Sequence, residues 1–235
     1  MKKKLVIIPA YNERGNIVKT VRDIIENAPS FDYVVINDCS KDDTRAICEK
    51  HGFHVVNLPV NLGIGGGVQT GYLYAMQEGY DIAVQFDGDG QHNGRYLEMM
   101  ADKLEEEKLD MLIGSRFIEN EGFQSSFMRR LGINIISFMI KLFTGKKIYD
   151  VTSGYRACNK ELINFFADNY ADDYPEPEAI ITSVLSGFKV GEVPVVMVER
   201  QGGTSSIRSL KSAYYMIKVC LALVVDRIKV RKAGK

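Results

Sequence analysis

Five short apolar runs alternate with helix-like segments over the first 115 residues, and this alternation constrains the fold more than any other feature of the chain. Each run is almost continuously apolar, which is typical of strands buried on both faces of a parallel sheet. The alternation predicts a doubly wound α/β sheet that binds ligands at the carboxyl ends of its strands. The expected strands are KLVIIPA (4–10), DYVVIND (32–38), FHVVNLP (53–59), DIAVQFD (81–87) and LDMLIGS (109–115). The expected helices lie at 16–27, 42–51, 64–78 and 93–107.

The second half of the chain is less regular, and no repeat or low-complexity linker divides it. Residues 131–145 are apolar on nearly all faces, with Lys141 as the only charge, and they follow a polar, basic loop at 123–130. An acidic, proline-containing loop is expected at 171–179, and a strand-like run follows at 188–200.

The charge of the chain is balanced but unevenly distributed. Thirty acidic and thirty basic residues cancel, so no overall field favours nucleic acid as a partner. We expect one domain over residues 1–207 and a basic, amphipathic helix or tail over 208–235, associated with a membrane or a partner protein. In that tail only Asp226 opposes the basic residues Arg208, Lys211, Lys218, Arg227, Lys229, Arg231, Lys232 and Lys235.

The cysteines and the apolar segments indicate a cytoplasmic location. The four cysteines form no CxxC pair and lie at no zinc-binding spacing, which favours reduced thiols. The start of the chain has too short an apolar core for a signal peptide and is expected to be the first strand. No stretch reaches the roughly 20 apolar residues that a membrane-spanning helix needs.

Two aspartates, Asp87 and Asp89, follow the fourth apolar run with Gly88 between them. Carboxylates at the end of a buried strand are costly unless their charge is used. A tight turn at Gly88 lets both carboxylates meet one hard cation, Mg²⁺ or Mn²⁺, whose shell substrate phosphates would complete. A plain Asp-Gly turn is the alternative. A calcium loop is not favoured, although Glu98 stands at its twelfth position, because such a loop follows a helix.

Polar residues also follow the other runs. Glu13 follows the first run and Asp38 the second, where an acid can accept from a ribose hydroxyl or a base N–H, or can simply cap a helix. The glycine-rich segment at 61–71 opens the third helix, and a helix N-terminus favours anions. This segment is neither a Walker A motif nor a dinucleotide fingerprint. The strand ends together place polar residues where such sheets bind ligands.

These motifs resemble those of family 2 glycosyltransferases with the GT-A fold, in order and in spacing. The subgroup that the chain most resembles contains dolichyl-phosphate mannose synthase-like and bacterial polyprenyl-phosphate sugar synthase-like enzymes. The resemblance implies a Rossmann-like, mostly parallel sheet with flanking helices and a C-terminal amphipathic helix. It rests on PAYNE (9–13), NDCSKDDT (37–44), NLGIGGGVQTG (61–71), DGDGQH (87–92) and GSR (114–116). SFMRRLGINIIS (126–137), YDVTSGYRA (149–157) and GEVPVVMVERQGGTSS (191–206) extend it to about residue 207.

The resemblance also implies roles for individual residues. Three arginines would face the acceptor phosphate, because arginine forks suit bidentate phosphate recognition. Two of them, Arg129 and Arg130, also fit a solvated loop. The catalytic residues would be Asp89, Arg116, Arg129 and Arg130, and the divalent cation would be held by Asp87, Asp89 and Gln91. The nucleotide-sugar donor would be bound by Pro9, Tyr11, Glu13, Asp38, Gly63, Asp87, Gly88, Arg200 and Ser205.

Two positions depart from the family pattern. Asn37 stands where many members have the first of two aspartates, and Ile64 stands where many have a lysine. The missing lysine weakens the expectation that the glycine-rich loop makes a charged contact with the sugar donor.

The acceptor can be a lipid phosphate or a hydroxyl. A hydroxyl needs a general base, whereas a lipid phosphate is already anionic. No QxxRW segment, common among sugar-to-sugar relatives, is present. Glu176 or Glu178 matches a glutamate of the lipid-phosphate subgroup, and either also fits the start of a helix. The apolar segments at 131–143 and 213–225 suit a membrane surface, or equally core or dimer packing.

We therefore predict a metal-dependent, inverting glycosyltransferase. It would move a sugar from a UDP-sugar, or from GDP-mannose, to undecaprenyl or dolichyl phosphate in cell-wall or surface polysaccharide assembly. It would work at the inner face of the cytoplasmic membrane, with a small integral membrane protein or a second copy of the chain as candidate partners. The alternatives are transfer to a glycan hydroxyl and a non-catalytic scaffold that binds nucleotide sugars.

Overall fold

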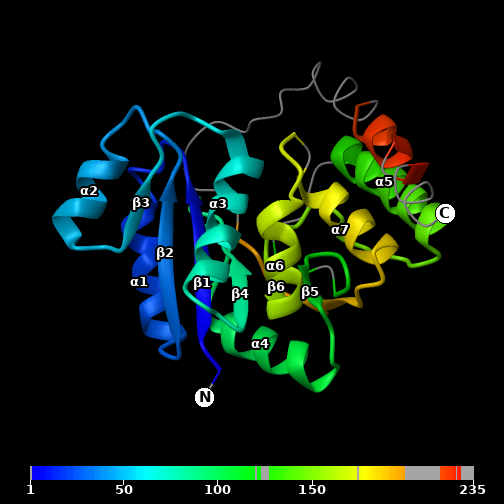
Figure 1. The fold of residues 1–235 in the computed structure, drawn as a ribbon, viewed down its shortest axis with the longest axis horizontal. Helices are drawn as coiled ribbons and strands as arrows, with labels where there is room; N and C mark the ends of the chain where they lie inside the picture. Colours follow the sequence, from blue (N-terminus) through cyan, green and yellow to red (C-terminus); the bar gives the residue numbers. More distant parts are fainter. Residues whose placement is uncertain are drawn as a thin grey trace.

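A seven-stranded sheet forms the centre of the protein, seen here in a computed structural model (Figure 1). The strand order is β3-β2-β1-β4-β6-β5-β7, and all neighbours are parallel except the two pairs that β6 makes. The strands are β1 (Lys4–Ala10), β2 (Phe31–Asn37), β3 (Val55–Asn57), β4 (Ile82–Gln85), β5 (Met111–Ser115), β6 (Arg156–Asn159) and β7 (Val190–Pro194). The structure describes residues 2–119, 121–122, 127–173, 175–198, 218–225 and 227–228, and of residues 127–129 the backbone alone.

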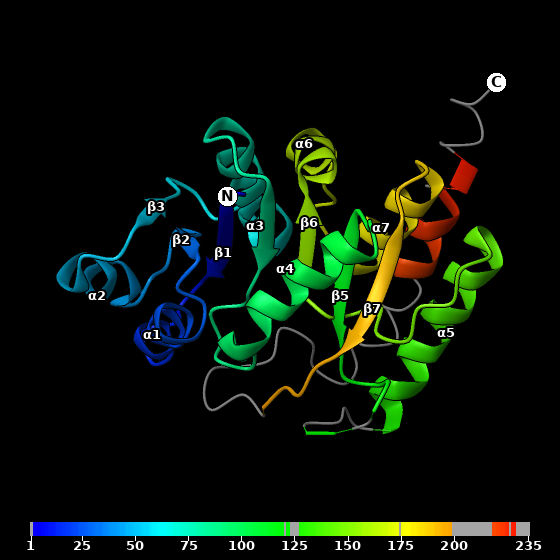
Figure 2. The same ribbon diagram turned by 90° about the horizontal axis from the view of Figure 1, so that it is seen from below.

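Helices cover both faces of this sheet (Figure 2). Apolar residues of α1 and α4 bury one face, and those of α3, α5, α6 and α7 bury the other, so that each face has its own hydrophobic core. The helices are α1 (Ile17–Asn27), α2 (Thr44–His51), α3 (Gly63–Gln77), the 3₁₀ turn η1 (Gly94–Tyr96), α4 (Leu97–Glu106), α5 (Phe127–Thr144), α6 (Lys160–Asp168) and α7 (Pro175–Leu185). Residues 218–225 and 227–228 are also helical.

The predicted α/β fold is confirmed. The five apolar runs form β1 to β5, and the four helical segments form α1 to α4, each within a few residues of its expected bounds. Every residue of β4 and β5 is buried, which explains why these strands are apolar without alternation. The strand-like run at 188–200 contains β7.

Two segments that were expected to be loops contain the starts of helices. The prediction at 171–179 is wrong from Pro175 onward, where α7 begins. Proline suits a first helical turn because its N–H is not needed there and its φ is already helical. The prediction at 123–130 is wrong from Phe127 onward, where α5 begins, so the backbone of both predicted arginines is helical.

The antiparallel strand β6 was not predicted, and it positions the site. Its first residue, Arg156, lies opposite Gln85 of β4 and Ile113 of β5. Because β6 runs against its neighbours, its beginning lies at the edge where the parallel strands end.

The expected C-terminal amphipathic helix is present over residues 218–225. Val219 and Leu223 are fully buried in the core that α5 also joins, whereas Leu221 and Val225 are exposed. This helix lies beside α5 in both ribbon views (Figures 1 and 2). Among the helices of the described residues, none has the length and apolar character to cross a membrane. The expected domain boundary at 207 lies outside the described residues.

Candidate active site

The carboxyl edge of the sheet gathers most of the predicted site residues. β1 pairs with β2 on one side and with β4 on the other, and all three end at this edge. The beginning of β6 and the end of β5 continue it. Glu13, Asp38, Asp87 and Arg116 therefore follow neighbouring elements along one line. This is where open α/β sheets bind ligands.

Asp38 closes the N-terminus of α3. Its carboxylate accepts hydrogen bonds from the backbone N–H groups of Leu62 (2.7 Å) and Gly63 (2.9 Å). Gly63 has a φ of +77°, a left-handed conformation that favours glycine. Asp38 therefore does cap a helix, which was the alternative to a nucleoside contact. The capped helix is α3, and not α2, which follows Asp38 in the sequence. Each carboxylate oxygen has two lone pairs, so the capped side chain retains acceptor capacity toward a nucleoside.

Glu13 joins the loop after β1 to the start of α2. Its backbone N–H donates to Thr44 Oγ1 (2.9 Å), and its carboxylate accepts from the Asn16 side chain (2.9 Å). Glu13 is buried, whereas the nearby Tyr11 is exposed over 42% of its surface. An exposed aromatic ring at a strand end offers a flat apolar surface for a nucleobase.

The Asp87-Gly88-Asp89 turn packs closely against β1. The Gly88 N–H donates to the carbonyl of Pro9 (3.2 Å), and the Gly88 carbonyl accepts from Thr20 Oγ1 (3.3 Å). A Cβ at position 88 would lie 3.0 Å from the Pro9 carbonyl oxygen, so a side chain there would push the turn away. Asp89 Oδ1 accepts from the backbone N–H of Gln91 (3.1 Å).

Asp87 is anchored through its backbone and its side chain. Its N–H donates to His92 Nδ1 (3.0 Å), and its Oδ1 accepts from Gln85 Nε2 (3.1 Å). His92 is buried and stacks on Tyr155, with ring centroids 4.7 Å apart. Burial lowers the pKa of His92 to about 4, so the ring is neutral near pH 7 and Nδ1 can accept.

The residues of this turn fit a magnesium or manganese ion. Asp87 and Asp89 offer two carboxylates, and Gln91 offers an amide oxygen while its Nε2 donates to the Val198 carbonyl (3.2 Å). No cluster of three or more His, Cys, Asp or Glu side chains able to hold a metal ion occurs among the described residues. A set of few oxygen ligands that leaves room for phosphate and water is what Mg²⁺ prefers in proteins.

Arg116, expected at the acceptor phosphate, forms a buried ion pair. Its Nε and Nη2 donate to the two carboxylate oxygens of Asp150 at 2.7 and 2.8 Å, and Nη2 also donates to Thr152 Oγ1 at 3.0 Å. The exposed fraction of the side chain is 6% for Arg116 and 0% for Asp150. Much of the hydrogen-bonding capacity of this guanidinium is therefore directed into the protein.

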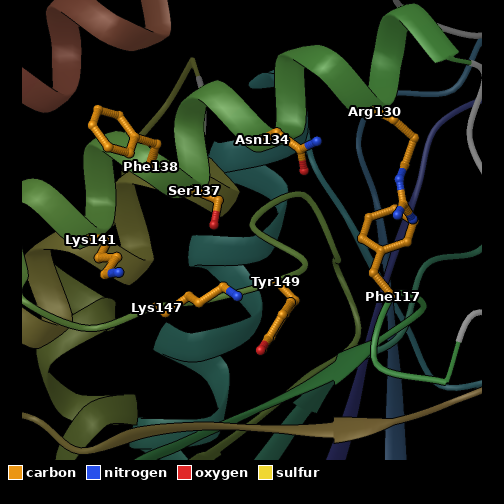
Figure 3. Close-up of a pocket in the computed structure, with 8 residues that line it drawn as sticks. All are labelled: Phe117, Arg130, Asn134, Ser137, Phe138, Lys141, Lys147 and Tyr149. Atoms are coloured by element: carbon orange, nitrogen blue, oxygen red, sulfur yellow. The ribbon is translucent and has the colours of Figure 1, made fainter.

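Arg130 lies at the rim of a basic pocket under α5 (Figure 3). Its guanidinium carbon lies 4.1 Å from the centre of the Phe117 ring, a cation–π contact that orients the charge. The pocket has a volume of about 370 Å³. It is lined by Phe117, Arg130, Asn134, Ser137, Phe138, Lys141, Lys147 and Tyr149.

Three predicted residues cannot be placed within the site. The side chain of Arg129 and the whole of Arg200 and Ser205 lie outside the described residues. Arg129 itself belongs to α5 by its backbone.

Several residues that position the site were not predicted as site residues. Gln85, His92 and Asp150 each hold a predicted residue by a hydrogen bond. Gln85 has a sequence signal, because it is a polar residue inside an otherwise apolar strand. His92 and Asp150 lie within motifs that carry the family resemblance, but their partners could not be read from spacing alone.

A family model described as glycosyl transferase family 2 matches residues 5–166. The chain belongs to this family. Members of the family are glycosyltransferases, and the chain is accordingly a hexosyltransferase with the GT-A fold. This confirms the resemblance that the motifs indicated.

Two curated relatives have names that refer to polyprenyl lipids. The chain is 28% identical to polyprenol monophosphomannose synthase of Mycolicibacterium smegmatis over 92% of this chain and 84% of the relative. It is 27% identical to undecaprenyl-phosphate mannosyltransferase of Micrococcus luteus over 86% of each chain.

The solved structures support the fold. Glucosyl-3-phosphoglycerate synthase of Mycobacterium tuberculosis, solved with Mn²⁺, UDP-glucose and phosphoglyceric acid, superposes with a TM-score of 0.69 and 18% identity. The alignment covers 96% of this chain and 80% of the solved one. At this identity the likeness concerns the fold alone.

Proposed function

We propose that this glycosyltransferase moves a sugar from a nucleoside diphosphate to the phosphate of a polyprenyl lipid. One observation carries the proposal: the acidic turn of Asp87 and Asp89 follows the end of β4, and Phe117, in the wall of the basic pocket that Arg130 lines, follows the end of β5 at the same sheet edge. Such a pair of surfaces suits a donor that binds through a cation and an acceptor that binds through its own negative charge. The names of the relatives, which act on polyprenyl phosphates, agree with it.

The donor would lie over the ends of β1, β2 and β4. Tyr11 would face the base, and Asp38 and Glu13 would accept from the nucleoside. Gly63 and Gly88 would let the backbone approach the donor closely. A UDP-sugar is the preferred donor and GDP-mannose the second candidate.

Asp87, Asp89 and Gln91 would hold Mg²⁺ or Mn²⁺ against the donor diphosphate. The ion, when bound, neutralises charge on the leaving nucleoside diphosphate. The protein contributes a turn whose direction is held by Pro9 and His92. Pre-arranged ligands spare the reorganisation that the developing charge would otherwise require.

The acceptor phosphate would be bound by Arg130 and Arg129, with Arg116 behind them. An oxygen of the lipid phosphate would form the new bond to the anomeric carbon while the bond to the nucleoside diphosphate breaks. We propose inversion at that carbon. The phosphate oxygen is already anionic, so no side chain needs to remove a proton.

A glycan hydroxyl is the second candidate acceptor. Glu176 and Glu178 lie in the first turn of α7, and either could serve as the base that a hydroxyl needs. A helix start favours the ionised form of a carboxylate. Acidic residues in a first helical turn also stabilise the helix without any catalytic role. These two glutamates therefore do not favour a hydroxyl, and the lipid phosphate is the preferred acceptor.

We further propose that the protein binds the inner face of the cytoplasmic membrane through α5 and the C-terminal helix. Phe138 and Leu142 of α5 are exposed over 65% and 67% of their surfaces, and Leu131 and Ile135 continue this stripe. Leu221 and Val225 add a second stripe on the neighbouring helix. Basic residues of the 208–235 tail would meet anionic lipid headgroups. A small integral membrane protein or a second copy of the chain are the alternative occupants.

Transfer to lipid tests the proposal directly. The purified protein would be incubated with labelled UDP- and GDP-sugars, undecaprenyl phosphate and Mn²⁺ or Mg²⁺. Label that moves into the organic phase supports the proposal, and label found only on a water-soluble glycan supports the hydroxyl acceptor. Binding of nucleotide sugar without any turnover would support the scaffold alternative.

A further inference from the structure

A buried polar cluster lies beneath Asp87, on the face of the sheet that α3 and α6 cover. It consists of Gln85 of β4, Arg156 of β6 and Tyr170, which follows α6. Gln85 is 1% exposed, Arg156 0% and Tyr170 8%. Buried polar side chains are costly unless they are paired, so each needs a physical reason for its presence.

The amide of Gln85 can take only one orientation here. Its Nε2 donates to Asp87 Oδ1 (3.1 Å), and its Oε1 accepts from the Tyr170 hydroxyl (3.3 Å). A carboxylate only accepts, so the nitrogen must face Asp87. Burial raises the pKa of Tyr170 well above its ordinary value, so its hydroxyl keeps the proton that it donates.

Arg156 favours the same orientation. It lies directly opposite Gln85 in the antiparallel pair, where side chains of the two strands are neighbours. Its Nε donates to the Ser153 carbonyl (2.7 Å), and within the described residues neither terminal nitrogen has a hydrogen-bond partner. A guanidinium has donors only, so its charge repels the Gln85 nitrogen and attracts the oxygen.

The carboxylate of Asp87 is confined from the other side as well. A Cβ built on Gly154 would lie 2.5 Å from Asp87 Oδ2 and 2.9 Å from Gln85 Nε2. The bare backbone of Gly154 therefore lies against the carboxylate and its donor. Gln85 beneath the Asp87 carboxylate and Gly154 beside it therefore both restrict its direction.

We propose that Gln85 is a positioning residue, held in place by Tyr170 and Arg156, that aims the Asp87 carboxylate at the divalent cation. This inference rests on the proposed metal site. The two terminal nitrogens of Arg156 are buried without a hydrogen-bond partner among the described residues, which destabilises a fold, so the stability of the protein does not explain the cluster. The cluster is explained instead by its effect on the Asp87 carboxylate, because partners that orient a metal ligand typically change metal affinity by about 10- to 100-fold.

The test measures Mn²⁺ affinity by electron paramagnetic resonance of free Mn²⁺, with UDP or GDP present, together with the melting temperature of the metal-free protein. Gln85→Leu is expected to weaken Mn²⁺ binding about tenfold or more. Tyr170→Phe removes only a hydroxyl, and it serves if the first variant fails to fold. It should weaken binding by less, and it should add nothing in the Gln85→Leu background because it acts through Gln85.

A matched control and a reference variant separate the outcomes. Gln69→Leu removes a similar amide hydrogen bond, to the Ala167 carbonyl at 3.1 Å, away from Asp87, and should leave Mn²⁺ affinity unchanged. If Gln85→Leu binds Mn²⁺ within twofold of the wild type while Asp89→Asn does not, the positioning role is refuted and the metal site stands. If Asp89→Asn also binds like the wild type, the proposed metal site itself is wrong.

Discussion

The two halves of the carboxyl edge hold charge in different ways. On the donor side, two carboxylates are held by backbone N–H groups: Asp38 by Leu62 and Gly63, and Asp89 by Gln91. On the acceptor side, cations are held by side chains far away in sequence, as Arg116 is by Asp150. Backbone donors follow from where strands end and helices begin. Side-chain partners follow from tertiary packing, so the donor side is much easier to predict.

The largest expected effect is on the donor side. Asp89→Asn removes one negative charge from the proposed metal site and should lower sugar transfer by about 10³-fold, with the melting temperature nearly unchanged. Initial rates with saturating donor and Mn²⁺ measure it. Asp43→Asn is the matched control, because Asp43 is an acid on the same side whose side chain is 76% exposed. Activity of Asp89→Asn within tenfold of the wild type would contradict the assignment.

The second effect concerns stability on the acceptor side. Asp150→Ala leaves the buried Arg116 guanidinium without its carboxylate and should reduce the free energy of unfolding by about 3–5 kcal/mol. Urea denaturation followed by circular dichroism measures it.

A surface pair provides the control for Asp150→Ala. Arg45 and Glu49 also lie 2.7 Å apart, Nε to carboxylate oxygen, but in solvent. Glu49→Ala should therefore reduce the free energy of unfolding far less than Asp150→Ala does. Equal losses in the two variants would mean that burial does not distinguish these pairs.

The elements that could be predicted from the sequence follow the same division between local and tertiary interactions. β1 to β5 and α1 to α4 could be predicted because continuous apolar runs and helical periods are local signals. β6 has four residues and lies antiparallel among parallel strands, so no local pattern marks it. The start of α7 was missed because acids and prolines are common in loops as well as in first helical turns.

The site shows the same contrast residue by residue. Glu13, Asp38, Asp87 and Asp89 follow strand ends, so their common edge could be predicted from the order of elements alone. Arg116 also follows a strand end, yet its partner lies 34 residues away and could not be foreseen. Roles at the acceptor phosphate therefore depend on the family resemblance and remain predictions.

The third prediction concerns the exposed stripe of α5. Replacing Phe138 and Leu142 together by serine should weaken binding to vesicles of phosphatidylglycerol and phosphatidylcholine by about ten- to a hundredfold, because full burial of a large apolar side chain contributes about 1.5–3 kcal/mol and a lipid surface would bury each of the two only in part. Sedimentation with vesicles measures it. Ile25→Ser, at an exposed apolar position of α1, should leave vesicle binding unchanged. Equal losses in both variants would mean that the stripe is not the membrane surface.

The smallest expected effect lies in the basic pocket. Lys147 lines it and rests over the Tyr149 ring, with Nζ 4.1 Å from the ring centre. Because the reacting phosphate is proposed to bind at Arg130 and not at Lys147, this ammonium should attract the ground state and the transition state alike. Lys147→Gln should therefore raise the KM for polyprenyl phosphate about two- to fivefold at unchanged kcat, an effect that salt should reduce.

Lys19, an exposed residue of α1 on the donor side, provides the control for Lys147→Gln. Lys19→Gln removes the same charge from the protein but not from the pocket, so its KM for the lipid should equal that of the wild type. A fall in kcat for Lys147→Gln would place this lysine at the transition state instead. The acceptor side would then contain a catalytic cation held by an aromatic ring, as Arg130 is held by Phe117. That result would narrow the difference between the two sides, because both would then hold charges that act on the reacting atoms.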